Sequence, residues 1–383
     1  MMSEWRTIRA ADFIDFNPRL NLKKGAITTK VAMDKLKPFT KKIPETEKAE
    51  FNGGAKFCNG DTVMARITPC LENGKTAYVD MLDDGEIGFG STEFIVMRAK
   101  AGISDPQFVY YTAINPTFRN VAIKSMVGSS GRQRVQQSVL EELELSVPGL
   151  DEQRRIGAFL AELDEKIALN NKINDNLHQQ AATLFKALFV DLTPFDGTMP
   201  PNWTISTLGD ATEMGAGGDK PKESSPVKTP LCPYPIYSNG INDYGLYGYT
   251  NDPKIKVESV TVSARGTIGY VCLRHTPYVP IVRLVTLIPD TKLLSAKYLY
   301  LYLRQLHITG TGTTQQQLTV PDFRKTEIII PDKNTMDSFT ETVTPLFEQI
   351  WANEDENTKL AEVRDALLPK LMSGEIDVSD IQL

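Results

Sequence analysis

The sequence predicts an α+β protein built from two mixed α/β lobes and two long helices that form an antiparallel coiled coil. Three observations lead to this fold class. A heptad pattern of apolar residues occurs twice, 183 positions apart, and a globular segment with matching short motifs precedes each copy. Hydrophobic residues make up 41% of the 383 positions and charged residues 23%, which is ordinary for a folded protein. We therefore expect an internal pseudo-two-fold repeat.

The first heptad pattern begins just after Pro148. Its core positions recur at alternating steps of four and three, as in the buried seam of a coiled coil. They are Ile156, Leu160, Leu163, Ile167, Asn170, Asn174, Leu177, Ala181, Leu184 and Leu188.

The second pattern has the same spacing and places two asparagines at the same steps. Its positions are Phe339, Val343, Leu346, Ile350, Asn353, Asn357, Leu360, Arg364, Leu367 and Leu371. Because proline disfavours helix interiors, we expect this helix to start near Pro345 or to kink there, and Pro369 to bend or end it.

The segments before the helices share short motifs. "TVMARITPCLENGKTAYV" at 62–79 and "TVSARGTIGYV" at 261–271 each predict a strand, a loop and a second strand, with the longer loop in the first copy. Both halves open near a tryptophan, both contain one short helical stretch, "DPQFVYYTAI" or "SAKYLYLYLRQL", and both end in a strand before Pro148 or Pro331. The expected division is 1–147 first lobe, 148–192 first long helix, 193–330 second lobe, and 331–383 second long helix with the C-terminal segment.

Net charge of −6 hides a segregation of charge. Residues 17–137 hold 18 Lys and Arg against 12 Asp and Glu, and residues 214–325 hold 13 against 7. The helical segments are acidic, with 5 against 7 in 148–191 and 4 against 12 in 331–383. Two basic lobes on acidic helices are typical of a protein that binds a polyanion at two places.

Composition also argues against other classes. There is no long apolar run and no apolar signal core near the N-terminus, which predicts a cytoplasmic protein with no membrane partner. The four cysteines show no close pairing, so we expect free thiols, buried or half-buried. The three histidines, His178, His275 and His307, form no cluster at metal-ligand spacing, so no metal site is expected.

Several of these motifs resemble the specificity (S) subunit of type I restriction-modification systems. They are "GDTVMARITPCLENGK" at 60–75, "LDEQRRIGAFLAELDEKI" at 150–167 and "VRDALLPKLMSGEID" at 363–377, within the two-lobe repeat. The resemblance implies that each lobe is a target-recognition domain reading one half of a split double-stranded DNA sequence, with the paired helices as spacer. It also implies two methyltransferase (M) subunits, which carry S-adenosylmethionine, and restriction (R) subunits as partners. This chain itself would then take part in DNA methylation and restriction without a cofactor of its own.

Motifs that suggest catalysis fit poorly. "NPTF" at 115–118 lacks the second proline of the DNA amino-methyltransferase motif, and Asn115-Pro116 more plausibly ends the helix that begins near Pro106. "LENGKT" has Pro69 where a phosphate-binding loop needs glycine. "MGAGGDK" at 214–220 is only a weak match to a cofactor loop. We therefore expect a non-enzymatic subunit with no catalytic residues.

Candidate DNA-binding residues lie in loops rich in Gly, Ser, Thr, Gln and Arg, because Arg and Gln can read base edges while Lys, Ser and Thr contact phosphates. In the first lobe they are Arg66, Thr68, Lys75, Ser129, Ser130, Arg132, Gln133 and Arg134. In the second lobe they are Arg265, Thr267, Arg283, Thr313, Thr314, Gln315 and Gln316. For each of them a solvated loop residue is about as good an interpretation.

The four seam asparagines, Asn170, Asn174, Asn353 and Asn357, are the candidate helix-pairing residues. In an antiparallel pair the amides can meet and hydrogen-bond, whereas a slipped register would bury them against leucine, so we expect them to set the register. The 33 residues from Ile156 to Leu188 span about 50 Å, enough to hold two half-sites about one DNA turn apart. Two alternatives stay open: the recognition part of a fused methylase-nuclease, and a coiled-coil scaffold without DNA binding.

Overall fold

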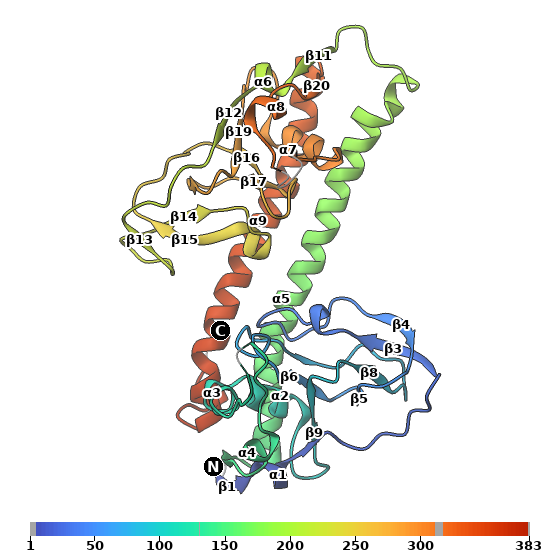
Figure 1. The fold of residues 1–383 in the computed structure, drawn as a ribbon, viewed down its shortest axis with the longest axis vertical. Helices are drawn as coiled ribbons and strands as arrows, with labels where there is room; N and C mark the ends of the chain where they lie inside the picture. Colours follow the sequence, from blue (N-terminus) through green and yellow to red (C-terminus); the bar gives the residue numbers. More distant parts are fainter. Residues whose placement is uncertain (1–4, 130, 311–316, 382–383) are drawn as a thin grey trace. The chain divides into compact units, whose positions relative to one another are not determined.

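The computed structural model describes residues 5–129, 131–310 and 317–381. The chain divides into two compact units, one of residues 1–172 and 353–383 and the other of residues 173–352. Each unit therefore contains one lobe and a part of each long helix (Figure 1). Among the described residues, no helix has the length and apolar composition needed to cross a membrane.

The lobe of unit 1 contains two four-stranded sheets, ordered β2-β9-β6-β7 and β4-β3-β8-β5, and the two-stranded ladder β1-β10. Its strands are β1 Arg6–Arg9, β2 Ile14–Phe16, β3 Ile27–Val31, β4 Glu47–Glu50, β5 Ala55–Phe57, β6 Thr62–Ala65, β7 Thr76–Tyr78, β8 Gly88–Gly90, β9 Phe94–Ala99 and β10 Glu144–Val147. Its short helices are α1 Ala10–Phe13, η1 Met33–Lys35, α2 Pro106–Ile114, α3 Pro116–Lys124 and α4 Gln137–Glu141.

The lobe of unit 2 repeats this plan with the sheets β12-β19-β16-β17 and β13-β15-β14-β18 and the ladder β11-β20. Its strands are β11 Thr204–Thr207, β12 Thr212–Ala216, β13 Ser224–Ser225, β14 Tyr234–Tyr237, β15 Leu246–Thr250, β16 Ser259–Val262, β17 Val271–Arg274, β18 Val279–Pro280, β19 Val285–Pro289 and β20 Glu327–Ile330. Its short helices are η3 Thr193–Phe195, α6 Leu208–Ala211, η4 Asn242–Gly245, α7 Ala296–Gln305 and α8 Val320–Phe323.

The matching strands occupy the same places in the sheets of the two lobes, since β6 lies between β9 and β7 and β16 lies between β19 and β17. Thr62 lies opposite Met97 in the β6-β9 pair, and the matching Thr261 lies opposite Thr286 in the β16-β19 pair. In both lobes the first strand, which follows a tryptophan, pairs antiparallel with the last strand before the long helix. The expected fold class, two α/β lobes with an internal repeat and two long helices, is confirmed.

The first long helix, α5, spans Leu150–Phe185 and continues into a π-helical turn, η2, at Lys186–Val190. Gly157 lets it approach α2 closely, because a Cβ at this position would lie 2.9 Å from the Cβ of Gln107. One seam position was wrong: the side chain of Leu184 is 41% exposed, and Phe185 is buried instead. A straight helix drifts from a strict seven-residue repeat, and Phe185 packs against Tyr298 and Phe339 of unit 2.

The second long helix, α9, spans Lys333–Ser373. The expectation that it starts near Pro345 was wrong, since it begins twelve residues earlier. The buried side chains of Phe339 and Val343 precede the proline on the same helix face as Ile350. Their burial offsets the roughly 3 kcal/mol that proline costs inside a helix. The helix ends four residues after Pro369, before the short helix η5 at Val378–Asp380.

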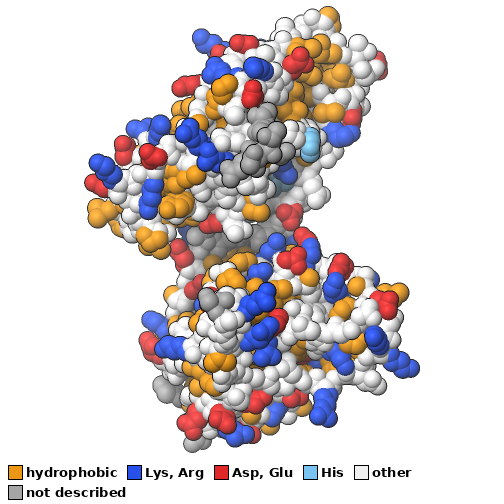
Figure 2. Space-filling model, in the orientation of Figure 1, with side chains coloured by type: hydrophobic (Ala, Val, Ile, Leu, Met, Phe, Trp, Pro, Cys, Tyr) orange, Lys and Arg blue, Asp and Glu red, His pale blue; other side chains and the backbone are white. Residues whose placement is uncertain are grey.

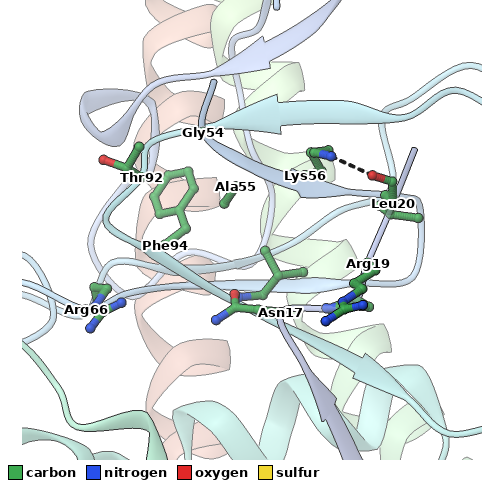
Figure 3. Close-up of a pocket in the computed structure, with 11 residues that line it drawn as sticks. Asn17, Arg19, Leu20, Gly54, Ala55, Lys56, Arg66, Thr92 and Phe94 are labelled. Atoms are coloured by element: carbon green, nitrogen blue, oxygen red, sulfur yellow. Dashed lines mark hydrogen bonds between the residues drawn. The ribbon is translucent and has the colours of Figure 1, made fainter. Parts of the chain in front are cut away.

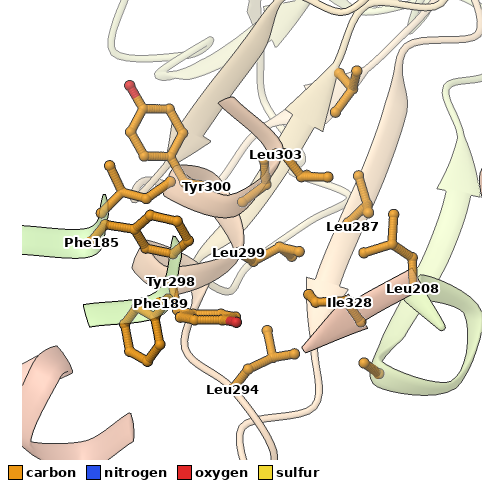
Figure 4. Close-up of a cluster of buried hydrophobic side chains, with 14 of the residues drawn as sticks. Phe185, Phe189, Leu208, Leu287, Leu294, Tyr298, Leu299, Tyr300, Leu303 and Ile328 are labelled. Carbon is orange, nitrogen blue, oxygen red and sulfur yellow. The ribbon is translucent and has the colours of Figure 1, made fainter. Parts of the chain in front are cut away.

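Each unit has its own hydrophobic core between the lobe and the long helices. In unit 2, α7 sits between the β16-β19 sheet and the long helices, with Tyr298, Leu299 and Leu303 buried (Figure 4). The core of unit 1 joins α2 to α5 and α9 through Phe108, Ile156 and other buried residues, and a separate cluster fills the space between its two sheets.

The two long helices run antiparallel where they meet inside each unit. In unit 1, Arg364 of α9 donates a hydrogen bond to Asp164 of α5. Further along α5, Asn170 donates to Asn357, which lies before Arg364 in α9. In unit 2, the Nδ2 group of Asn174 donates to the backbone oxygen of Ile350 at 3.4 Å.

Candidate nucleic-acid interface

The first-lobe candidates gather around the end of strand β6. The backbone N–H of Thr68 donates to the oxygen of Gln133 at 3.0 Å, and the N–H of Val135 donates to the oxygen of Arg66 at 2.8 Å. Arg134 in turn forms a bridge with Val127. Two loops far apart in sequence, with Arg66 and Val135 separated by 69 positions, are thereby joined through backbone hydrogen bonds. Arg66, Thr68, Gln133 and Arg134 lie together as a result.

The turn beside this junction is exposed. The backbone N–H of Arg132 donates to the oxygen of Ser129 at 3.0 Å, and both side chains are exposed. Ser130 lies outside the described residues. Arg132 is free of ion pairs within the described ranges, so its guanidinium is available to a base or a phosphate.

Arg134 is held by a carboxylate. Its Nη2 lies 2.6 Å from Oε1 of Glu93, and its Nε lies 3.0 Å from both carboxylate oxygens. This pairing raises the pKa of Arg134 and lowers the pKa of Glu93 below its usual range. The ion pair fixes the direction of the guanidinium, as direct readout of a base requires, but Glu93 also takes up donors that a base would otherwise receive.

Lys75 and Thr68 make contacts inside the protein. The ammonium of Lys75 donates to the backbone oxygen of Met33 at 2.9 Å, and Oγ1 of Thr68 lies 3.5 Å from the sulfur of Met126. Both residues are half-buried. Their side chains therefore hold the loops in place rather than face a ligand.

In the second lobe, Arg265 and Thr267 share the loop after β16, and both are exposed. The Nε and Nη2 groups of Arg265 donate to Oε1 of Gln317 at 3.2 and 3.0 Å. The N–H of Leu318 donates to the oxygen of Ala264 at 3.0 Å, so the segment that follows α7 returns to this loop as in the first lobe. Thr313, Thr314, Gln315 and Gln316 lie outside the described residues.

Arg283 lies on a different loop that one side chain connects to the first. The amide of Asn239 accepts from the N–H of Ala264 at 2.7 Å and donates to the oxygen of Val282 at 2.6 Å. Asn239 thus brings the segments that carry Arg265 and Arg283 together. The only sequence signal for this role is the turn-like "SNG" at 238–240. Arg283 is exposed with a left-handed φ of 64°.

The motifs that suggested catalysis have structural roles. The Oδ1 atom of Asn115 accepts from the N–H of Thr117 at 3.0 Å, which caps α3, and α2 ends at Ile114 as expected. Gly74 occupies a tight turn with a φ of 73° in contact with Phe39. Of the four free cysteines one is buried and three are half-buried, as expected. Within the described ranges, no group of His, Cys, Asp and Glu is arranged to hold a metal ion.

Each lobe thus presents arginine-bearing loops at the end of the same strand, and lysines and arginines are spread over the visible faces of both lobes (Figure 2). The model of the type I restriction modification DNA specificity domain matches residues 2–179 and again residues 200–362. The chain therefore belongs to this family of DNA sequence-specificity proteins.

Individual relatives agree with this assignment. The type I restriction enzyme HindI specificity subunit of Haemophilus influenzae is 26% identical over 402 residues, covering 83% of this chain and 86% of the relative. The MjaIX specificity subunit of Methanocaldococcus jannaschii is 26% identical over 308 residues, covering 72% and 70%. The crystal structure of a type I restriction-modification S subunit from M. genitalium shares the fold, with a TM-score of 0.56, 17% identity and 96% of each chain covered.

Proposed function

We propose that this chain is the non-catalytic DNA-recognition subunit of a type I restriction-modification complex and that it reads a bipartite target. Each lobe contacts one half-site, and the paired helices hold the half-sites apart by an unread spacer. Two methyltransferase subunits dock on the chain and supply S-adenosylmethionine and catalysis, and restriction subunits complete the nuclease.

The observation that carries this proposal is the repeated loop junction. In each lobe a loop that begins with an arginine, Arg66 or Arg265, follows the matching strand of the sheet, and a second loop from beyond the lobe's helix is hydrogen-bonded to it through the backbone. Arg134 and Arg265 each have a side-chain partner that fixes the guanidinium, and a fixed arginine fork suits the O6 and N7 edge of guanine. Two such junctions in one chain suit two half-sites.

Charge supports the same interpretation. Each lobe segment carries an excess of six basic residues, while the helical segments are acidic. DNA phosphates would be attracted to the lobes and repelled from the helices, which leaves the helices for protein partners.

The direct experiment is to co-express the chain with its methyltransferase subunit in a host without other adenine or cytosine methylation, and to map the methylated sites across the genome. The methylated sites should share one motif of two short defined halves separated by a spacer of fixed length. A contiguous motif would contradict the two-lobe reading, and methylation by the purified chain alone would indicate the fused-enzyme alternative. A chain that neither directs methylation nor binds DNA in a salt-dependent way would be a scaffold.

A further inference from the structure

The lobe of unit 1 contains an open pocket beside the loop junction. It has a volume of about 590 Å³ and lies between the loop that follows β2, the strand β5 and the start of β9 (Figure 3). Its lining includes Asn17, Arg19, Lys56, Arg66, Thr92 and Phe94. Arg66 belongs both to this pocket and to the junction with Gln133 and Val135, so the pocket adjoins the proposed DNA-reading loops.

The pocket is positively charged. Three of its eleven lining residues are Arg or Lys and none is acidic. Arg19 is exposed, and within the described ranges its side chain makes neither a hydrogen bond nor an ion pair. One of the three N–H groups of the Lys56 ammonium donates to the backbone oxygen of Leu20 at 2.5 Å. The structure leaves the remaining donors of these two cations for an anion.

Arg66 adds an unsatisfied donor at one side of the pocket. Its Nε is buried without a hydrogen-bond partner, and its Nη2 reaches the oxygen of Val135 only at 3.4 Å. A buried donor without a partner is unfavourable, so an acceptor that moved within reach of this guanidinium would be favoured.

The interior of the pocket is apolar. Phe94 and Val96 of β9 are buried, and Ala55 lies across from the ring of Phe94 (Figure 3). An apolar surface surrounded by cations matches one repeating part of DNA, the deoxyribose with its phosphate. The sugar carbons can pack on the apolar side chains while the phosphate oxygens accept from Arg19 and Lys56.

We infer that this pocket anchors one sugar-phosphate group of the DNA backbone next to the half-site read by the first lobe, with Arg19 as the main phosphate contact. The inference rests on the proposed function. It assigns Arg19 and Lys56, which the sequence did not single out, to positioning of the duplex rather than to base readout.

The wall that holds the pocket differs between the two lobes. The pocket needs β5, which pairs antiparallel with β8 at the edge of the second sheet. In the second lobe the segment in the corresponding place, before β16, forms a single antiparallel bridge between Ile255 and Tyr278 rather than a strand. Close packing of the pocket wall also depends on Gly54, where a Cβ would lie 2.0 Å from the backbone oxygen of Gly90.

The test compares Arg19→Ala with Arg9→Ala, which removes an exposed arginine of the same lobe outside the pocket. The full chain is co-purified with its methyltransferase subunit, and its Kd for a duplex is measured by fluorescence anisotropy at several salt concentrations. Arg19→Ala should weaken binding about tenfold for target and non-target duplexes alike and lower the slope of log Kd against log salt by about 0.9. Equal behaviour of the two variants would overturn the inference.

A second pair of variants adds negative charge instead of removing a cation. Thr92→Glu places a carboxylate in the pocket, whereas Thr117→Glu places one on exposed α3. Only the first should weaken DNA binding. If the wild-type protein shows no salt-dependent DNA binding, the proposed function itself is wrong. If the wild type binds DNA normally and Arg19→Ala binds equally well, only the inferred anchor is wrong.

A free nucleotide carries the same sugar and phosphate, so it is tested separately. Deoxyadenosine monophosphate is titrated calorimetrically into wild type and Arg19→Ala without DNA. Tight binding that Arg19→Ala abolishes, together with unchanged DNA affinity, would make the pocket a nucleotide site and overturn the DNA anchor. Absence of tight binding, with the DNA effect present, supports the anchor.

Discussion

Arg364 and Asp164 form a buried ion pair that connects the two long helices inside unit 1. The Nη1 of Arg364 lies 2.6 Å from Oδ1 of Asp164, and both side chains are less than 10% exposed. The other carboxylate oxygen accepts from the hydroxyl of Tyr111 at 2.6 Å, and this hydroxyl accepts from the ammonium of Lys41 at 3.2 Å. The network therefore joins the first lobe to both helices.

The same positions are apolar in the other half of the repeat. A shift of 183 residues takes Asp164 to Phe347 and Ala181 to Arg364, and Phe347 and Ala181 are both fully buried in unit 2. We therefore expect Arg364→Ala or Asp164→Phe alone to lower the free energy of unfolding by about 3–5 kcal/mol, since each breaks the buried ion pair and Arg364 without Asp164 keeps only the exposed Asp365 as a partner. The double variant copies unit 2 and should lose less than either single variant.

Urea denaturation followed by circular dichroism measures these differences. Arg154→Ala is the matched control, because the ion pair of Arg154 with Asp151 is exposed and its loss should change stability by less than about 1 kcal/mol. Additive effects of the two single substitutions would show that the ion pair does not couple the helices.

We expect Lys41 to make the stability of the protein depend on pH. Its ammonium is 3% exposed among the rings of Tyr78, Tyr110 and Tyr111, and burial lowers the pKa of Lys41 to about 8, although Asp164 opposes the shift. Between the folded pKa and the ordinary value of 10.5, the unfolded chain binds a proton that the folded chain does not, so stability rises with pH. From pH 7 to 9.5 the wild type should gain about 2 kcal/mol relative to Lys41→Met. A constant difference in unfolding free energy across this range would contradict the assignment.

We expect the seam asparagines to set the register in which the two long helices pair. In unit 1 the amide of Asn170 donates to Oε2 of Glu356 at 2.7 Å and to Oδ1 of Asn357 at 3.0 Å, while Asn357 donates to Oδ1 of Asn171 at 2.9 Å. A single Asn170→Leu should cost about 1–3 kcal/mol because the Oδ1 acceptor of the half-buried Asn357 then loses its donor. Leucine at all four seam asparagines should permit slipped pairing.

Distances between spin labels at Glu165 and Lys359, both exposed in unit 1, report the register in a background without the four native cysteines. The four-leucine variant should show a second population in which the helices are displaced by about 10 Å, one heptad. A single unchanged distance would mean that the asparagines do not set the register.

Substitution of Arg265 should change the DNA sequence preference of the protein. If it reads a base, Arg265→Ala should cost about 1–3 kcal/mol of binding and relax preference in one half-site only, and Arg134→Ala should do the same in the other half-site. Glu93→Gln, which releases Arg134 without removing it, is the control for lost orientation. Binding to a panel of duplexes with single base changes measures this, and an equal loss on all sequences would reassign the arginine to phosphate contact.

Much of the fold could be predicted because it follows local patterns. The heptads, the repeated Ala-Arg strand and the prolines before the helices are periodic or short-range signals. The seam also contained a hint of the buried ion pair, since Arg364 occupies a core position, but its partner Asp164 sits one place beside the seam residue Leu163. The pairing of Arg364 with Asp164 depends on where the fold places Tyr111 and Lys41, and no local sequence pattern specifies those places.

The site was less predictable because long-range pairing builds it. Arg66 and Arg134 meet only through backbone bonds between two distant loops, and strand β5, which completes the pocket beside them, is three residues long. Such short strands are selected by their sheet neighbours rather than by their own residues. Arg19 likewise follows no motif, and only the fold brings it to Lys56.

The central claim, that each lobe reads one half of the target, is tested most directly by exchanging residues 17–137 for the corresponding lobe of another family member and mapping methylated sites genome-wide. If each lobe reads its own half-site, one half of the motif should change while the other half stays the same. A motif in which both halves change, or in which neither does, would contradict it.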